Sequence, residues 1–216
     1  MEVQEQPDKL AVPSDESLMA SAQGGDFDAF QELTKRFQPR VFGLTFRILG
    51  QAQDAEDATQ QTFLSMIEHL ESFRGEASVA TWVLRIATNH ALKLLRKRNR
   101  GPILTPFESM ASDDSAPLPH PDFIAPWSIP PDELAARTEV QQNIHKALAD
   151  LDEKYRTVFT LRDIEGFSVK ETAGILQITE SSVKVRLLRA RLMLRERLTR
   201  MYGDEAAQLF PTHDHG

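Results

Sequence analysis

The stretch SVKETAGILQITESSVKVRLLRARLMLRERL, residues 168–198, contains two helical patterns separated by a three-residue break. Ser168 followed three residues later by Glu171 is a capping box, which predicts the start of a short helix. The break at 177–179 predicts a tight turn, after which Thr179 can cap a longer helix. A short helix, a tight turn and a basic second helix are the helix-turn-helix plan, in which the second helix enters the major groove of DNA.

The second of these helices carries both an apolar and a basic face. Val183, Leu187 and Met193 or Leu194 are expected to face the core, and in the first helix Ala173 and Leu176 do the same. Four cations are expected to point away from that core: Lys184, Arg186, Arg189 and Arg191. This pattern favours DNA binding, and a purely structural helical hairpin is the alternative.

The rest of the chain also reads as helix, because strand alternation is nowhere sustained and Gly and Pro cluster at breaks. Ser14 predicts a helix that ends at Gly24, and Asp26 caps the next one. Pro39 fits the start of a further helix that stops at Gly50. Two more helices are predicted at about 53–71 and from the end of the 73–78 loop to about 100, followed, after a break, by two more helices around 140–151 and 158–165.

The segment 101–136 differs from its surroundings, since it holds eight of the chain's twelve prolines and is acidic. Such a composition does not pack a core and favours an extended path. We therefore expect an all-α protein of two helical domains joined by a Pro-rich acidic linker, with the helix-turn-helix in the C-terminal domain. The expected boundaries are an acidic N-terminus at 1–13, domains at 14–100 and 132–202, the linker at 101–131, and a tail at 203–216.

Positive charge is concentrated in two places although the 216-residue chain has a net charge of −7. Residues 89–100 contain five cations and no acid, and residues 181–200 contain seven cations and one acid. Two basic clusters divided by an acidic stretch are typical of two contacts on one polyanion. Solvated helix faces are the alternative explanation.

Several classes of protein do not fit this sequence. There is no cysteine, and hence no disulfide framework or thiolate metal site. The N-terminus does not resemble a signal peptide, and no apolar run approaches the roughly 20 residues of a membrane span. No phosphate loop, zinc motif or catalytic nucleophile pattern is present, so we expect a cytoplasmic protein that is not an enzyme and needs no cofactor. His213, Asp214 and His215 could bind a metal, but a flexible tail without one is preferred.

The chain resembles the extracytoplasmic-function (ECF) class of bacterial RNA polymerase sigma factors. The resemblance rests on four stretches in order: DAEDATQQTFLSMIEHLESF (54–73), FRGEASVATWVLRIATN (73–89), LDEKYRTVFTLRDIEGFSVKETAGIL (151–176) and SSVKVRLLRARLML (181–194). It covers roughly 14–100 and 132–200. It implies a protein that binds core polymerase, recognises and melts a promoter, and initiates transcription of a specific regulon in response to a stress or signal.

The resemblance implies that the helix beginning near residue 54 docks on the clamp helices of the polymerase's largest subunit, while the flap is a further contact of the protein. The expected polymerase-binding residues are Asp54, Glu56, Asp57, Gln60 and Gln61. Charged groups would supply orientation and association rate, and apolar neighbours most of the affinity. A solvated polar face is the alternative.

For the −10 promoter element, the resemblance implies that the 73–78 loop receives a flipped base, while later cations neutralise phosphates. The expected −10 residues are Phe73, Arg74, Asn89, Lys93, Arg96, Lys97, Arg98 and Arg100. Many family members have an acid at the position of Lys93, so the base preference does not carry over. Trp82 shares helical spacing with Val79 and Ile86, which favours a place in the core over a stacking role.

For the −35 element, the expected residues are Ser181, Ser182, Lys184, Arg186, Arg189 and Arg191. Gln177 stands where glycine is common, and a left-handed conformation there costs ~1 kcal/mol or more. We therefore expect the turn to be slightly remodelled. The linker is long enough for both contacts. Two dozen base pairs at ~3.4 Å span about 80 Å, and 36 extended residues reach roughly 110 Å.

The implied partners are core RNA polymerase, promoter DNA and an anti-sigma protein, without membrane insertion of the chain itself. The acidic linker is implied to enter the polymerase cleft. A conventional regulator, with a helix-turn-helix on a helical sensor domain, is the rival. It would bind duplex DNA alone and would need neither the polymerase-binding helix nor the basic end of the first domain.

Overall fold

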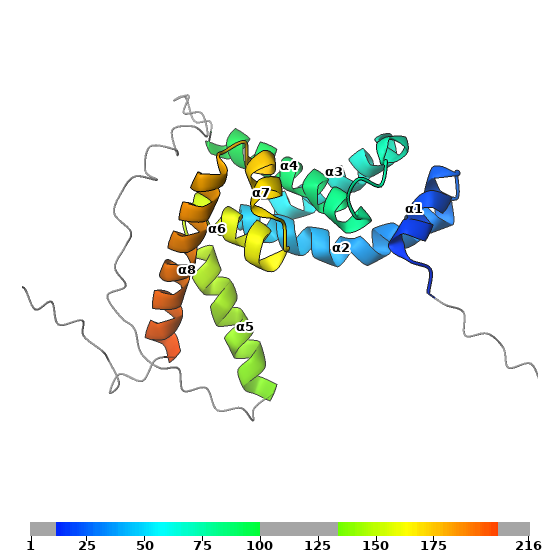
Figure 1. Cartoon of the computed structure of the whole chain (residues 1–216). Helices are drawn as coiled ribbons and strands as arrows, with labels where there is room; N and C mark the ends of the chain where they lie inside the picture. Colours follow the sequence, from blue (N-terminus) through cyan, green and yellow to red (C-terminus); the bar gives the residue numbers. More distant parts are fainter. Residues whose placement is uncertain (1–11, 100–133, 203–216) are drawn as a thin grey trace, which may run out of the picture.

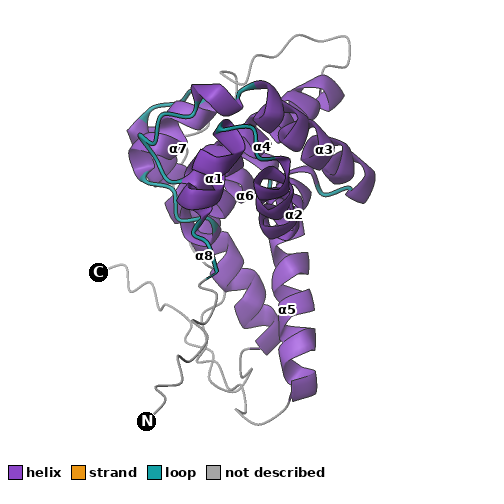
Figure 2. Ribbon diagram, turned by 90° about the vertical axis from the view of Figure 1, so that its right-hand side faces the viewer, coloured by secondary structure: helices purple, strands orange, loops and turns teal. Residues whose placement is uncertain are grey.

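The computed structural model describes residues 12–99 and 134–202, and within these ranges every regular element is helical (Figures 1 and 2). The expected N-terminus, linker and tail lie largely or wholly outside the described residues. The first domain comprises α1 (Asp15–Gln23), α2 (Phe27–Leu49), α3 (Ala52–Glu68), η1 (Leu70–Ser72) and α4 (Val79–Asn99). The second comprises α5 (Leu134–Ala149), α6 (Glu153–Phe159), the π-helical turn η3 (Thr160–Ile164), α7 (Val169–Leu176) and α8 (Glu180–Tyr202). The all-α prediction is confirmed.

The predicted caps of the first domain are present. The Ser14 hydroxyl accepts a hydrogen bond from the Ser17 amide at 3.1 Å. Asp26 accepts hydrogen bonds from the amides of Asp28 and Ala29. Gly50 ends α2 in the left-handed conformation, with φ of 72°, where a side chain would be strained.

The prediction that a new helix starts at Pro39 is wrong, because α2 runs unbroken through it. One buried stripe continues across the proline, from Phe30, Leu33 and Phe37 to Val41, Leu44 and Ile48. Proline within a helix removes one backbone hydrogen bond and costs about 3 kcal/mol. Burying this stripe against α3 and α4 stabilises the helix by more than the proline costs, because each large apolar side chain contributes roughly 1.5–3 kcal/mol.

The helix-turn-helix forms as predicted. Ser168 and Glu171 make the reciprocal capping box, with Ser168 N–H donating to Glu171 Oε2 at 2.7 Å and Glu171 N–H donating to Ser168 Oγ at 3.1 Å. The expected remodelling of the turn does not occur, because Gln177 itself adopts the left-handed conformation, at φ 57° and ψ 45°. Thr179 Oγ1 accepts from the Ser182 amide at 3.1 Å, so Thr179 caps α8.

The two domains are packed together. One cluster of buried side chains contains the core of α1–α4 and also residues of the second domain, among them Val158, Leu161, Phe167 and Leu176. A separate cluster lies where α5, α6 and α8 meet, and contains Leu148, Tyr155 and Leu194. In Figure 1, α7 lies beside α4, while α5 and α8 extend away from the first domain.

Candidate functional site

The polar side chains of α3 face outward as the sequence predicts. Glu56, Asp57, Gln60 and Gln61 are exposed. Asp54 differs, because it is half-buried and its Oδ2 lies 3.6 Å from Nη1 of Arg98. The predicted polymerase face is therefore continuous except at its first residue.

Two exposed apolar residues extend this face toward the end of α3. Leu64 is 54% exposed and Ile67 is 50% exposed. Spacings of three and four residues place both in line with Asp57, Gln60 and Gln61. Leu64 and Ile67 were not among the predicted residues, although the sequence places them at helical spacing from the polar set.

A groove separates this face of α3 from the basic end of α4. It encloses about 450 Å³ and is lined by Asp57, Gln60 and Gln61 on one side and by Lys93 and Lys97 on the other. Acidic and amide side chains thus lie directly across from the two lysines. A protein bound on α3 would come close to a polyanion bound on α4.

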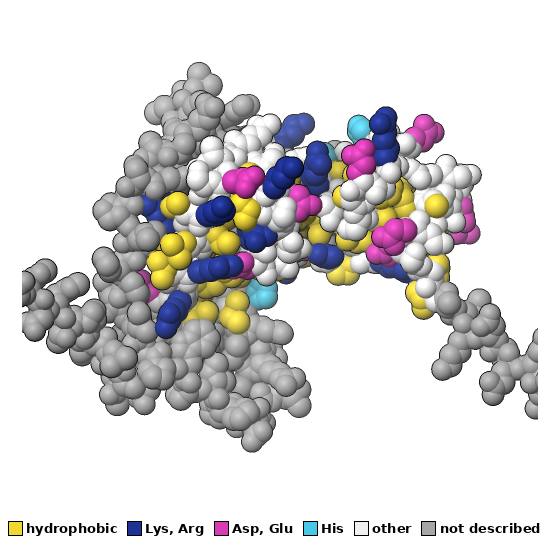
Figure 3. Space-filling view, in the orientation of Figure 1, with side chains coloured by type: hydrophobic (Ala, Val, Ile, Leu, Met, Phe, Trp, Pro, Cys, Tyr) yellow, Lys and Arg dark blue, Asp and Glu magenta, His cyan; other side chains and the backbone are white. Residues whose placement is uncertain are grey.

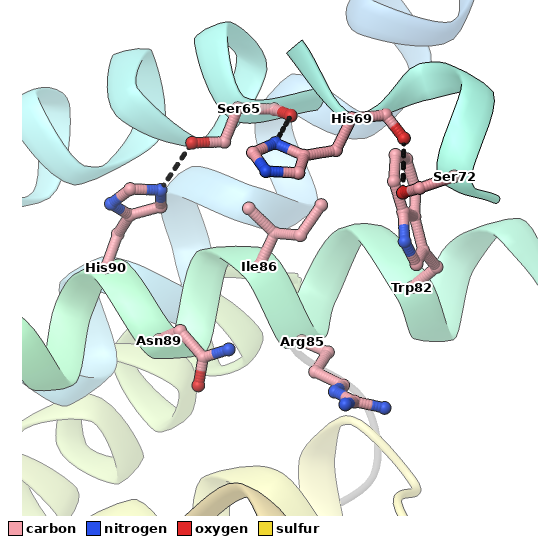
Figure 4. Close-up of a pocket in the computed structure, with 8 residues that line it drawn as sticks. All are labelled: Ser65, His69, Ser72, Trp82, Arg85, Ile86, Asn89 and His90. Atoms are coloured by element: carbon pink, nitrogen blue, oxygen red, sulfur yellow. Dashed lines mark hydrogen bonds between the residues drawn. The ribbon is translucent and has the colours of Figure 1, made fainter. Parts of the chain in front are cut away.

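A second hollow between α3 and α4 lies nearer the 73–78 loop and has a volume of about 430 Å³ (Figure 4). Ser65 Oγ lies 2.9 Å from Nε2 of His90, and His69 Nδ1 lies 3.0 Å from the Ser65 carbonyl oxygen. Burial lowers the pKa of His90, with a further decrease from the charge of Lys93. The ring is therefore favoured in its neutral form.

Trp82 is half-buried against the core, the place that the sequence favours for it. It packs against the core cluster, and its ring lies 5.4 Å from that of Phe73 between centroids. It also lines the hollow with Ile86 (Figure 4). Asn89, predicted to contact a base, is exposed and lines the same hollow.

The 73–78 loop borders a third hollow, of about 600 Å³, against α1. Gln23 Nε2 donates hydrogen bonds to the carbonyl oxygens of Leu70, at 3.0 Å, and of Phe73, at 2.9 Å. Gly75 supplies a positive φ of 71°, a conformation that suits glycine. Phe73 is half-buried at the mouth of the loop and Arg74 is exposed.

The cations at the end of α4 are not equivalent. Lys93 and Lys97 are exposed, and Arg96 is half-buried. Arg98 Nη1 donates to the Leu49 carbonyl oxygen at 3.0 Å, and its Nη2 donates to Glu153 at 2.9 Å. Arg100 lies outside the described residues. Two of the predicted phosphate contacts, Lys93 and Lys97, are thus presented directly to solvent.

On α8 the expectation that four cations point away from the core is wrong for two of them. Arg186 is 0% exposed and Arg189 is 3% exposed. The helical period explains this, since Arg186 lies three residues after buried Val183, and Arg189 lies three residues after buried Arg186. Arg189 Nη1 donates to the Tyr155 hydroxyl at 3.3 Å, which ties α8 to α6.

The first turn of α8 keeps its predicted accessibility. Ser181 and Lys184 are exposed and Ser182 is half-buried. Arg191 is exposed but binds the carboxylate of Asp163 through two hydrogen bonds. Figure 3 shows Lys and Arg side chains spread over this face of the molecule, along the second domain and toward α4.

Within the described part of the chain, no group of three His, Asp or Glu side chains is placed to hold a metal ion. The predicted tail histidines lie outside the described residues. None of the described helices is both long enough and apolar enough to cross a membrane.

Comparison with known proteins identifies both halves of this arrangement. Residues 33–101 match the family model for sigma-70 region 2, and residues 141–194 match that for sigma-70 region 4. The RNA polymerase sigma-H factor of Pseudomonas aeruginosa is 32% identical over 182 residues, which cover 84% of this chain and 92% of that protein. The ECF RNA polymerase sigma-E factor of Haemophilus influenzae is 31% identical over 185 residues, which cover 86% of this chain and 95% of that protein. The chain belongs to the ECF sigma factors.

Solved structures agree with this assignment. The sigma factor RpoE of Bartonella quintana, in complex with the anti-sigma factor NepR, matches with a TM-score of 0.55 and 25% identity, over 79% of this chain and 96% of that one. CnrH, in complex with the cytosolic domain of CnrY, matches with a TM-score of 0.54 and 25% identity, over 87% of this chain and 99% of that one. This ECF sigma factor is therefore a transcription initiation factor that recognises promoters. Its region 2 match contains α3 and α4, and its region 4 match contains most of α8.

Proposed function

We propose that this sigma factor binds core RNA polymerase through α3, holds the melted −10 element on the 73–78 loop and α4, and reads the −35 element with the start of α8. One observation carries the proposal. The exposed face of α3 and the lysines of α4 line the same groove, with Gln61 and Lys93 among its walls. Polymerase docked on α3 would thus lie beside the DNA strand held by α4.

The polymerase contact rests on polar and apolar residues with different tasks. Asp54, Glu56, Asp57, Gln60 and Gln61 set orientation against the clamp helices and raise the association rate. Leu64 and Ile67 continue the same face, and burial of exposed apolar side chains supplies most of the affinity in protein interfaces.

The −10 contact combines a base site and a phosphate track. A base that leaves the stack costs a few kcal/mol, which a fitted pocket offsets. The hollow beside the 73–78 loop, with Phe73 and Arg74, fits that role by position. Asn89 supplies an amide for a base edge. The phosphate track comprises Lys93, Arg96, Lys97, Arg98 and Arg100.

The −35 contact is carried in this arrangement by Ser181, Ser182 and Lys184, because they occupy the accessible first turn of α8. The N-terminal residues of a recognition helix are the ones that meet base edges. Arg191 reaches a phosphate only when it exchanges its carboxylate partner for DNA. Arg186 and Arg189 contact DNA only if their packing changes.

The proposal also covers where the protein acts, the bounds of its two regions and how it is controlled. The protein acts in the cytoplasm as a non-enzymatic factor, with region 2 at 14–100 and region 4 at 132–202. An anti-sigma protein controls it, which is supported by the two related sigma factors that were solved with such partners. A stoichiometric complex with a purified anti-sigma protein that abolishes transcription would establish the control.

The decisive experiment is run-off transcription with purified core polymerase and a library of promoter fragments. Initiation from a subset that shares two short motifs supports the proposal. Asp57→Lys should lower initiation and core binding together, while Gln31→Ala, at an exposed position on α2, should change neither. A protein that binds duplex DNA but adds no initiation to core enzyme would contradict the proposal.

A further inference from the structure

Helix α1 and the 73–78 loop line a common hollow. Its volume is about 600 Å³, within the roughly 300–1,000 Å³ that is usual for ligand sites. Met19 of α1 lines the hollow and is only 1% exposed, so it lies at the bottom. Ala20 of α1 lines it from an exposed position. Helix α1 therefore makes one wall of the hollow that receives the base in the proposed function.

Gln23, the last residue of α1, holds the start of the loop. Its Nε2 donates to the carbonyl oxygens of Leu70, at 3.0 Å, and of Phe73, at 2.9 Å. A side-chain amide carries two N–H donors, so each carbonyl group can receive its own hydrogen. Leu70 begins η1, and Phe73 directly follows η1. One side chain thus fixes both ends of η1 and the residue from which the loop departs.

Gln23 can hold the loop firmly because α1 is itself fixed to the first domain. Its apolar face is buried in the core cluster. At the other end of α1, Arg36 of α2 donates from Nη1 to the Pro13 carbonyl oxygen at 2.7 Å and to Asp15 Oδ1 at 3.1 Å. Sites of defined shape depend on such supporting contacts.

The loop has few contacts of its own between its two ends. Residues 74–77 are exposed, and within the described part of the chain none of their amides makes a backbone hydrogen bond. At the far end, Ser78 Oγ accepts from the Thr81 amide at 3.1 Å, which fixes the loop to the start of α4. The shape of the loop therefore depends on Gln23 at one end and on Ser78 at the other.

Phe73 connects this support to the base site. It lines the hollow, and its ring lies beside that of Trp82. Aromatic rings are surfaces on which unstacked bases pack. Gln23 binds the carbonyl group of the same residue, so it also sets the position of the Phe73 ring.

The residues of α1 precede the segment 33–101 that matches sigma-70 region 2, so that match assigns them no role. We propose that α1 is part of the −10 base site: it forms one wall, and Gln23 is a positioning residue that holds the 73–78 loop in the shape that accepts the flipped base. This inference rests on the proposed function for the identity of the base site. Gln23 acts through the two carbonyl groups that it binds.

The support of the loop can be measured without DNA or polymerase. Trypsin cleaves after arginine, and cleavage after Arg74 requires the loop to open locally. Gln23→Met removes both donors but keeps the length and neutrality of the side chain, and the two residues have similar helix propensity. Cleavage after Arg74 in the full chain should become about fivefold faster, because two hydrogen bonds that hold the loop are lost.

Gln31→Met is the matched control, because it makes the same change at an exposed site of α2. Its cleavage rate after Arg74 should equal that of the unsubstituted chain. If Gln23→Met is cleaved no faster than Gln31→Met, the positioning role is overturned.

Base preference tests whether this support serves the −10 site. The promoter library of the run-off experiment gives the preference of each variant at every promoter position. Gln23→Met should weaken the preference about fivefold at one −10 position and leave the −35 motif unchanged. A general folding defect would instead lower initiation at all promoters without changing the preferred bases. Unchanged preference at every position, or an equal loss at both elements, would overturn the proposal.

The wall formed by α1 is tested by filling the hollow. Ala20→Phe adds a ring at a position that lines the hollow, and Ser21→Phe adds the same ring at the neighbouring exposed residue outside the lining. Ala20→Phe should lower initiation about tenfold or more, because the flipped base loses the pocket that offsets its unstacking. Both variants should bind core polymerase normally, since neither residue belongs to the proposed polymerase face. Equal initiation by the two variants would contradict the wall.

The two proposals fail separately. If Gln23→Met is cleaved faster but the unsubstituted chain adds no initiation to core polymerase, the proposed function is wrong, and the base site fails with it. If initiation is normal while cleavage and base preference are unchanged in Gln23→Met, this inference alone is wrong.

Discussion

The guanidinium of Arg191 on α8 binds the carboxylate of Asp163 in η3 through two hydrogen bonds, from Nε to Oδ2 at 2.8 Å and from Nη2 to Oδ1 at 2.7 Å. Paired hydrogen bonds of this kind are the strong form of an arginine–carboxylate contact. The pair raises the pKa of Arg191 and neutralises a cation on the basic helix. The positive charge offered to the −35 element is therefore smaller than the sequence of α8 indicates.

Replacing Asp163 by Asn should release Arg191 for phosphate contact. Affinity for a −35 duplex should rise, and the slope of log affinity against log salt should steepen by about one. The pair is partly exposed, with 55% of the arginine side chain and 22% of the aspartate accessible. The loss of folding stability should therefore stay within about 1 kcal/mol. Salt titrations of DNA binding check this, and an unchanged slope would contradict it.

Lys184→Ala and Arg191→Ala should differ, although each removes one cation from α8. Lys184 is exposed in the first turn, so its loss should weaken −35 binding across sequences and reduce the salt slope by about one. Arg191→Ala should have a smaller effect, because its charge is already paired with Asp163. Equal losses in the two variants would show that Arg191 exchanges Asp163 for DNA at no cost.

Gln177→Gly should stabilise the second domain. Gln177 is the one described non-glycine residue with a positive φ, and a left-handed side-chain residue costs roughly 1–2 kcal/mol. Glycine removes that cost, but it also raises the conformational entropy of the unfolded chain, which opposes folding. A net gain of about 0.5–1 kcal/mol in folding stability is expected. Thermal unfolding checks the sign, with Gln31→Gly in the interior of α2 as the destabilising control.

Local signals were sufficient to predict much of this fold. The capping box of Ser168, the caps at Ser14 and Asp26, and the tight turn at 177–179 each depend on residues within four positions of one another. Interactions of such short range can be predicted from the sequence alone.

The failures involve contacts distant in the chain. Pro39 lies in an unbroken helix because buried residues on both sides pack against other helices. Arg186 is buried although charge alone predicts exposure. Glu165 meets Arg40 across 125 positions, and nothing near Glu165 in the sequence distinguishes it from a solvated acid.

His90 should make the first domain less stable as the pH falls. Its pKa is lowered by burial, then by Lys93, against an opposing effect of Glu68. Because the folded-state pKa lies below the unfolded value of about 6.5, the unfolded chain binds more protons between the two values. Stability should therefore be full above about pH 7 and decline as the pH falls below 6.5.

Unfolding by urea at pH 7.5 and 5.5 measures this effect. His90→Gln should lose part of the difference between the two conditions. Ser65→Ala should keep most of it, because burial and not the 2.9 Å contact with Ser65 is the leading cause. A pH dependence that His90→Gln leaves unchanged would assign the effect to other groups.

Leu64→Ala should weaken binding to core polymerase with little effect on folding. The side chain is 54% exposed in the free protein, so little packing is lost when it is truncated. Full burial of a leucine contributes about 1.5–3 kcal/mol. About half of that, a factor of roughly 4 to 12 in affinity, is expected from a side chain that is already half-covered. Leu188→Ala, on an exposed apolar side chain of α8, is the matched control for core binding. If Leu64→Ala binds core enzyme as tightly as Leu188→Ala, the polymerase contact ends at Gln61, and the apolar end of α3 serves another partner.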